Sequence, residues 1–302
     1  MKNPISIGRP VVAKLMSIVL PGLGQLYNGE LNKAIWLFIG FAFFSIPGAA
    51  FLALHLPGRL MTIALLLSLI AALGIWIFGS IDALRVARRK QDDMRQGWQV
   101  SGLYALVLIV CNGFALPALI GYVRTHQVEA FRVPATSMAP NVLKGDFIFA
   151  DKRYNCPGCK QAVRRGDIVI FVNPNDRTQY FIKRIIGLPG ESIQIKDRHV
   201  LVDGKSLTQE QAGTNNDKEI TESDGKKRWQ VIWATSNKQQ PDVEITVPAG
   251  QVFLLGDNRG SSTDSRAFGT VPLMDVVGKA RQVWFSSDAS GVRWGRLGKM
   301  LD

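Results

Sequence analysis

The chain has 302 residues, 47% hydrophobic and 20% charged, which is too apolar for a disordered protein and too charged for a bundle made only of membrane helices. Residues 1–123 hold 10 of the 36 Lys and Arg and 4 of the 24 Asp and Glu, so the net charge of +12 is divided equally between this part and residues 124–302. Neither part has the Lys/Arg-rich blocks and aromatic platforms that bind nucleic acid, and we expect no nucleic-acid partner.

Three uncharged stretches in the first part are long enough to cross a bilayer, which takes about 20 apolar residues. They cover residues 34–54, 60–81 and 100–123. An earlier stretch, residues 11–27, is interrupted by Lys14 and by Pro21-Gly22, which favours an interfacial or re-entrant segment over a fourth span. We therefore predict a membrane domain over residues 1–123.

The basic residues predict how this domain is oriented, because short cytoplasmic segments are enriched in Lys and Arg. Residues 82–99 contain five of them, whereas the link between the first two stretches contains only Arg59. This places residues 82–99 in the cytoplasm and the chain after Arg124 outside it. The N-terminal apolar run is broken and no small-residue cleavage site follows, so we expect no cleavable signal peptide.

From about Phe131 the sequence changes to short strand-like runs bounded by Gly, Pro, Asn and Asp. These runs cover residues 146–150, 167–172, 180–186, 192–195 and 251–255. Without a long helical pattern between them, they predict an antiparallel all-β domain over residues 124–302. A polar stretch over about residues 205–245 is interpreted as a surface insertion carrying one hairpin, around Trp229 to Trp233.

Three segments of this domain hold residues suited to chemistry. In Pro134-Ala135-Thr136-Ser137-Met138-Ala139-Pro140, a serine stands between prolines, a pattern that by itself usually starts a turn. Lys183 interrupts an apolar strand, either as an exposed charge on an edge strand or as a buried amine with a lowered pKa. Residues 256–269 are rich in small residues, Asp and Arg, which fits a solvated loop or a hydrogen-bonded cradle.

In this order the segments resemble the bacterial type I signal peptidases, also called leader peptidases. Ser137-Met138 with Pro140 is similar to the nucleophile motif of that family, and three later segments are similar to its following strand, its lysine motif and its C-terminal motif. Those segments are residues 165–169, 183–191 and 256–266. The four matches span Phe131 to Pro272, while residues 1–123 share with the family only its membrane attachment.

The resemblance implies a membrane-bound serine endopeptidase that removes N-terminal signal peptides from exported preproteins. Ser137 would be the nucleophile and Lys183 the general base, which requires burial to lower the lysine pKa by on the order of 3–5 units. Ser262 would orient the lysine amine. Residues implied to be structural near the site are Asp257, Asp264 and Arg266. No cofactor or metal is implied. The three histidines lie outside the matched motifs: His55, His126 and His199.

The resemblance also implies the substrate and its place. The nucleophile follows the last apolar stretch by only about a dozen residues, which places the site near the bilayer surface. An extended substrate would add as a β-strand, with small residues at the first and third positions before the cut. Residues implied to bind it are Val133, Met138, Val142 and Ile182. The implied partners are preprotein signal peptides, the lipid bilayer and a neighbouring secretion translocon. The implied location is the bacterial inner (plasma) membrane, with the catalytic domain on the periplasmic or extracytoplasmic side.

Two residues depart from the family pattern. Ala135 replaces a serine whose hydroxyl helps to bind the oxyanion in many relatives, which leaves the backbone N–H of Ser137, with help from Thr136, as the expected donors. Asn141 replaces the threonine that usually follows Pro140, a change that we expect to matter little.

Two alternatives and one cysteine pair stay open. The chain can be a processing peptidase with a single dedicated substrate, or a catalytically inactive membrane-anchored β-domain that binds peptides. The presence of Ser137, Lys183 and Ser262 disfavours the inactive domain. Cys156 and Cys159 form a lone CxxC without the second ligand pair of a zinc site, so outside the cytoplasm a disulfide is favoured over free thiols.

Overall fold

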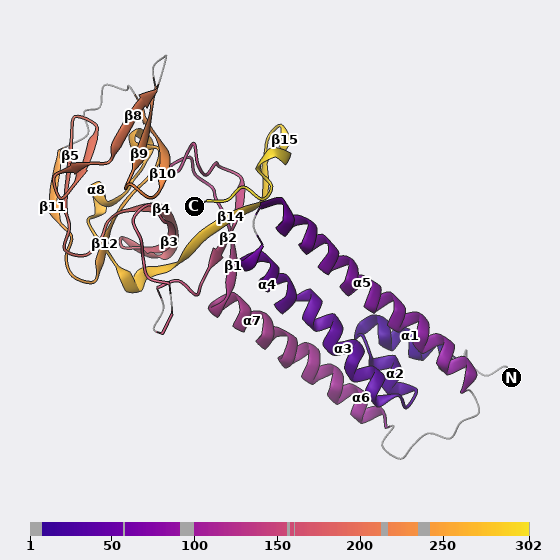
Figure 1. The fold of residues 1–302 in the computed structure, drawn as a ribbon. Coiled ribbons are helices and arrows are strands. Elements are labelled where there is room, and N and C mark those ends of the chain that lie inside the picture. Colours follow the sequence, from indigo (N-terminus) through magenta and orange to yellow (C-terminus); the bar gives the residue numbers. More distant parts are fainter. Residues whose placement is uncertain are drawn as a thin grey trace. The chain divides into compact units, whose positions relative to one another are not determined.

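The computed structural model describes residues 8–56, 58–90, 100–155, 158–159, 161–212, 217–234 and 242–301. The chain divides into two compact units, which Figure 1 shows as a set of helices and a set of strands. The helical unit comprises Met1–Leu56 and Met61–Thr125, and the strand unit comprises His126–Asp302 with Pro57–Leu60. Cys156, one half of the expected disulfide, lies outside the described residues.

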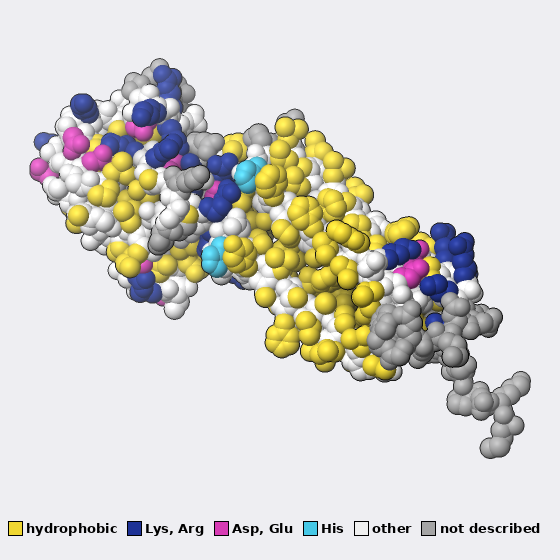
Figure 2. Space-filling model, turned by 60° about the horizontal axis from the view of Figure 1, so that its bottom comes forward, with side chains coloured by type: hydrophobic (Ala, Val, Ile, Leu, Met, Phe, Trp, Pro, Cys, Tyr) yellow, Lys and Arg dark blue, Asp and Glu magenta, His cyan; other side chains and the backbone are white. Residues whose placement is uncertain are grey.

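In the described part of the helical unit, three stretches are long and apolar enough to cross a membrane: Leu31–His55, Leu60–Arg89 and Ser101–His126. They overlap the three uncharged stretches of the sequence, and Figure 2 shows hydrophobic side chains covering much of this unit's visible surface. The elements are α1 (Arg9–Val19), α2 (Leu23–Tyr27), α3 (Leu31–Ser45), α4 (Pro47–His55), α5 (Gly58–Arg89), α6 (Ser101–Leu108), the π-helix η1 (Ile109–Ala115) and α7 (Leu116–His126).

The early apolar stretch, residues 11–27, is interrupted between α1 and α2, where the sequence has Pro21-Gly22. Gly22 has a φ of 93°, and a Cβ at this position would lie 2.3 Å from the carbonyl oxygen of Ala34, so only glycine fits. Gln25 of α2 is buried and its amide nitrogen donates to the carbonyl oxygen of Gly79 at 2.7 Å and to Asp82 at 3.1 Å. Both partners belong to α5, so the turn and the glutamine fix α2 against that helix.

Among its described residues the strand unit contains three sheets whose strand pairs are all antiparallel, which confirms the expected antiparallel β-domain. The largest sheet has the order β1-β2-β14-β3-β4-β12-β13, with β15 paired to β14. Its strands are β1 (Val128–Arg132), β2 (Asp146–Asp151), β3 (Ile168–Asn173), β4 (Asp176–Gly187), β12 (Gln251–Leu255), β13 (Val271–Pro272), β14 (Val276–Asp288) and β15 (Gly291–Val292).

Position in this sheet explains the local sequence of its strands. Strand β2 alternates buried and half-buried residues over most of its length, as expected for a strand with one face toward the core. Strand β3 lies between β14 and β4 and is buried on both faces, which accounts for its uninterrupted apolar run from Ile168 to Val172. Strand β4 pairs with β3 up to Arg184 and with β12 from Arg184 to Gly187, and its last five residues are buried.

The two smaller sheets are formed by strands that lie between β4 and β12 in the sequence. One has the order β11-β5-β6-β7 and the other β10-β9-β8. Their strands are β5 (Ser192–Lys196), β6 (His199–Val202), β7 (Lys205–Ser206), β8 (Thr208–Ala212), β9 (Asp217–Ser223), β10 (Arg228–Ala234) and β11 (Val243–Thr246). The insertion therefore contains a three-stranded sheet rather than the single hairpin that its composition predicted.

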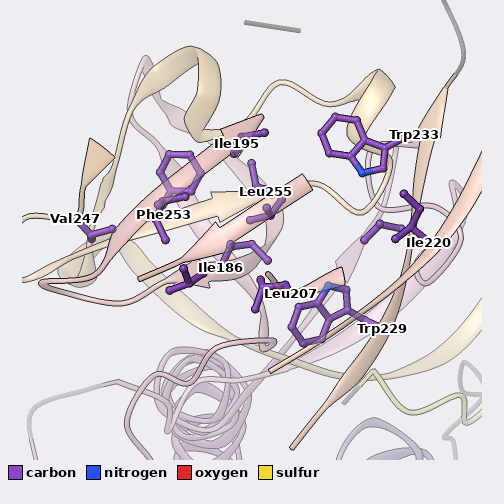
Figure 3. Packing of buried hydrophobic residues seen from close by; sticks show 13 residues of the cluster. Ile186, Ile195, Leu207, Ile220, Trp229, Trp233, Val247, Phe253 and Leu255 are labelled. Carbon is purple, nitrogen blue, oxygen red and sulfur yellow. The ribbon is translucent and has the colours of Figure 1, made fainter. Parts of the chain in front are cut away.

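The insertion is also not confined to the surface. Trp229, Val231 and Trp233 alternate along β10 and are all buried. Figure 3 shows both tryptophans in one hydrophobic cluster with Ile186 of β4 and Leu255 of β12. The polar average of the insertion conceals this alternation, because every second residue of β10 faces the core while its neighbours face away.

Candidate active site

Ser137 lies in the loop between β1 and β2, and backbone hydrogen bonds shape this loop. The N–H of Ala139 donates to Thr136 at 3.0 Å, and the N–H of Val142 donates to Met138 at 2.9 Å. From across the unit, the N–H of Asn258 donates to the carbonyl oxygen of Ser137 at 3.0 Å. The serine is half-buried, its carbonyl group is bonded to Asn258, and the loop on either side of it has its own hydrogen bonds.

Lys183 lies on β4 with its amine beside this serine. Its Nζ is 2.9 Å from Ser137 Oγ, within a hydrogen bond, and also donates to the carbonyl oxygen of Ile182 at 3.0 Å. The lysine is 4% exposed and stands opposite Val169 of β3. The alternative of an exposed charge is wrong, because the lysine side chain is buried, with β3 paired beside it and the pairing of β12 beginning at the next residue, Arg184.

Burial changes the proton affinity of this amine. Removal from water lowers the pKa of Lys183 to about 8, since the charged form loses more hydration than the neutral one. The negative charges of Asp264 and Asp257 act against this shift, and the positive charge of Arg266 adds to it. With a pKa of about 8, about one lysine in ten is neutral at pH 7.

Ser262 approaches the same place from the loop after β12. Its hydroxyl oxygen is buried, and its interaction with the Asp264 carboxylate helps to hold the pKa of that group below its usual value. A Cβ added to Gly256 would lie 2.1 Å from Ser262 Oγ and 2.6 Å from the carbonyl oxygen of Ser137. A glycine at this position therefore allows Ser262 and the backbone of the nucleophile loop to lie close together.

Two buried ion pairs surround these residues. Asp264 begins α8 (Ser265–Phe268), accepts two hydrogen bonds of 2.8 Å from the Arg266 guanidinium, and accepts one of 3.0 Å from the N–H of Gly256. Burial acts to raise the pKa of Asp264, but the hydrogen bonds and charge of Arg266 outweigh it and hold the pKa below its usual value. Asp257 accepts hydrogen bonds of 2.8 and 2.7 Å from Arg184.

Sequence reasoning missed several residues that surround Ser137, Lys183 and Ser262. Asn141 donates to Asp257 at 2.7 Å, so the replacement that was expected to matter little joins the ion-pair network. Arg184 could have been found from its place beside the motif lysine. Glu222, buried against Arg259, comes from the polar insertion and gave no signal in the sequence.

A cleft of about 320 Å³ opens beside the serine and the lysine. Its lining includes Ala135, Thr136, Val133 and Ile182 as well as Ser137 and Lys183. Two other residues expected to bind substrate, Met138 and Val142, are fully buried in the core cluster beneath and are not among the residues that line this cleft. Within the described part of the chain, no three His, Cys, Asp or Glu side chains are grouped so that they could hold a metal ion.

The chain is similar in sequence to known proteins. Residues 105–285 match the family model described as signal peptidase, peptidase S26. A signal peptidase I of Rickettsia typhi is 32% identical over 215 residues, covering 61% of this chain and 79% of the relative. A signal peptidase I of Pseudomonas aeruginosa is 31% identical over 199 residues, covering 57% and 70%. The crystal structure of a signal peptidase I from Enterococcus faecalis is 31% identical, covers 39% of this chain and 97% of its own, and superposes with a TM-score of 0.27.

The chain belongs to the signal peptidase family, a class of serine endopeptidases. Its Ser137 and Lys183 both lie within the matched residues 105–285.

The close packing at Gly256 gives a first prediction. Gly256→Ala should lower the rate of signal-peptide cleavage about a hundredfold, because the added methyl group displaces Ser262 or the Ser137 loop by about 1 Å. Cleavage of a preprotein by the purified protein in detergent measures this. Gly295→Ala is the matched control, since nothing lies within 4 Å of a Cβ there. A folded Gly256→Ala protein with the wild-type rate would contradict the prediction.

Proposed function

We propose that this protein removes N-terminal signal peptides from exported preproteins by a Ser/Lys dyad mechanism, with Ser137 as the nucleophile and Lys183 as the general base. The observation that carries the proposal is the 2.9 Å separation of Lys183 Nζ and Ser137 Oγ, combined with burial that brings the lysine pKa to about 8. A base must be within hydrogen-bond reach of its proton and able to exist in neutral form, and this lysine meets both conditions.

The reaction follows from these positions. Neutral Lys183 takes the hydroxyl proton as Ser137 Oγ attacks the carbonyl carbon of the scissile peptide bond. The resulting ammonium then gives that proton to the leaving amine as the C–N bond breaks, which leaves an acyl ester on Ser137. Lys183 next takes a proton from water, the hydroxide adds to the ester, and Ser137 leaves with its proton restored. The backbone N–H of Ser137, with Thr136 beside it at the cleft, is proposed to stabilise the oxyanion.

The residues around the dyad support further roles. Ser262 is proposed to orient the lysine amine, because its hydroxyl is buried against Gly256 beside the nucleophile loop. Asp257, Asp264 and Arg266 are proposed to be structural, since their ion pairs fix the loop that carries Ser262. The direct contact between serine and lysine favours an active enzyme over the inactive peptide-binding domain.

The cleft supports a substrate with small side chains near the cut. Val133 and Ile182 line the cleft and are proposed to contact the substrate, which would lie extended and add as a β-strand. Met138 and Val142 expose no surface, so we assign them to the support of the cleft and not to substrate contact. A cleft of about 320 Å³ holds only part of a peptide, which favours small residues at the first and third positions before the cut.

The membrane is the proposed place of reaction. Three helices are apolar enough to span it, and the basic residues after the second favour residues 82–99 in the cytoplasm and the strand unit outside. Signal peptides themselves contain an apolar segment that enters the bilayer, so an enzyme attached there meets them as they emerge. The lipid bilayer and a neighbouring secretion translocon are the partners this arrangement implies.

Removal of either member of the dyad should abolish cleavage. Ser137→Ala lacks the nucleophile, and Lys183→Arg keeps the charge but cannot deprotonate, so each should lower kcat by about 10⁴ or more. The double variant should be hardly slower than either single variant, because the two residues act as a unit. Ser206→Ala and Lys196→Arg, at exposed positions on β7 and β5, are matched controls for cleavage of a preprotein in detergent. Wild-type turnover in a Lys183 variant would end the dyad mechanism.

The pKa of the lysine predicts how activity depends on pH. Protonated Lys183 cannot accept the serine proton, so kcat/KM should be low at pH 6 and rise with pH until it levels off above about 8. Initial cleavage rates of a signal-peptide substrate between pH 6 and pH 10 give the profile. A profile that is flat across this range, or one that falls as pH rises through 8, would contradict a lysine base.

The proposed topology can be tested by labelling in intact cells. A cysteine placed at Lys90 should be protected from an impermeant thiol reagent, whereas one placed at Lys226, an exposed residue of the strand unit, should react. The unaltered chain, with its three native cysteines, gives the background. Reaction at position 90 from outside, or protection at position 226, would overturn the orientation.

A further inference from the structure

A buried charge pair joins the insertion to the catalytic loop. Arg259, which begins the short helix η2 (Arg259–Ser261), donates two hydrogen bonds of 2.6 Å to the carboxylate of Glu222 on β9. Trp229 of β10 donates a third, at 2.9 Å, to the same carboxylate. Glu222 and Arg259 are both fully buried. Such a pair adds little net stability, since each charge loses its hydration, but it fixes geometry because neither charge tolerates the loss of its partner.

A second connection bridges three segments through one amide. The side-chain nitrogen of Asn141 donates to Asp257 at 2.7 Å and to the backbone carbonyl of Gln230 on β10, also at 2.7 Å. The N–H of Ile232 on the same strand donates to the backbone carbonyl of Asp257 at 2.8 Å. Strand β10 is therefore bonded both to the loop that carries the nucleophile and to the loop that follows β12.

The tryptophans of β10 complete the contact. The guanidinium of Arg184 lies 5.2 Å from the ring centre of Trp229, and those of Arg259 and Arg266 lie 5.7 and 5.8 Å from that of Trp233. These distances are typical of cation–π contacts. Both rings belong to the hydrophobic cluster of Figure 3, so three arginines of the catalytic surroundings lie over side chains of the insertion.

The loop held in this way is the one that surrounds the lysine. Its residue Asn258 donates its N–H to the Ser137 carbonyl, and Arg259 Nε donates to the carbonyl of Gly256 at 3.0 Å. Gly256 is the residue against which Ser262 and the Ser137 backbone lie. The charged groups that act on Lys183 are Asp257, Asp264 and Arg266, and all three are on this loop.

We propose that the β9–β10 hairpin is a positioning element of the active site, which holds residues 256–266 against Lys183 and excludes water from its amine. Glu222 acts by its ion pair with Arg259, and the backbone of β10 acts by its hydrogen bonds with Asn141 and Asp257. Glu222 and Asn141 touch neither Ser137 Oγ nor Lys183 Nζ in these contacts, so they act through their partners. This proposal rests on the proposed function and gives the insertion a part in it.

Glu222→Gln tests the charge pair, because it keeps the shape of the side chain and removes the charge. The full-length protein in detergent should show kcat lowered about tenfold with KM changed less than about twofold. The rising limb of kcat against pH should also move upward by about half a pH unit or more, since a loosened loop admits water and restores hydration to the ammonium of Lys183. A role in stability alone would lower the melting temperature and leave the pH limb in place.

Asn141→Ala is the second variant, because it removes a half-buried amide without leaving an unpaired arginine. It should show the same two effects in smaller measure. Glu244→Gln is the matched control, since Glu244 is an exposed residue of the same insertion whose bond of 3.1 Å to Gln194 lies at the surface. It should match the wild type.

Failure of this proposal and failure of the proposed function give different results. A folded Glu222→Gln protein with the wild-type kcat and pH limb would overturn the proposal, and if that variant does not fold, an unchanged kcat and pH limb in Asn141→Ala would overturn it. Failure of the proposed function would give a different result. Ser137→Ala would then keep its cleavage activity, whatever the effect of the insertion variants on that activity.

Discussion

The burial of one lysine amine is the constraint on which the catalytic unit depends. An ammonium group loses favourable hydration when it leaves water, and this loss lowers the pKa of Lys183 to about 8. An exposed lysine, with a pKa near 10.4, would be neutral in only about one molecule in 2,500 at pH 7 and would rarely serve as a base. Lys183 is buried on β4 beside its partner strand β3, and in the proposed mechanism Ser137 supplies the proton to be moved.

Nearby negative charges would raise the pKa of the buried lysine unless they were paired. Asp257 and Asp264 would hold a proton on the lysine if their charges were unopposed, and each is instead paired with an arginine, Arg184 and Arg266. Paired carboxylates keep their hydrogen bonds within the loop and exert a reduced field on the amine. The ion pairs thus shape the loop and at the same time permit the lysine to lose its proton.

Attachment of this unit to a sheet and an insertion explains how the site keeps its geometry. Ser137, Lys183 and Ser262 come from three segments that are far apart in the sequence, and no single secondary structure could hold all three. The large sheet fixes Lys183, the loop hydrogen bonds fix Ser137, and the contacts with β10 fix the loop that contains Ser262. The apolar helices of the other unit are suited to keep such a site at the membrane, where signal peptides are found.

The sequence by itself determined the class of fold, the three membrane-compatible helices and the family, because hydrophobic periodicity and ordered motifs are local properties of the chain. Only the tertiary structure decided that Lys183 is buried, since exposed and buried lysines occur in strands of similar sequence. It likewise decided that Asn141 and Glu222 contact the catalytic surroundings. Asn141 and its partner Asp257 are 116 positions apart, and Glu222 and its partner Arg259 are 37 apart. No local pattern encodes such pairings.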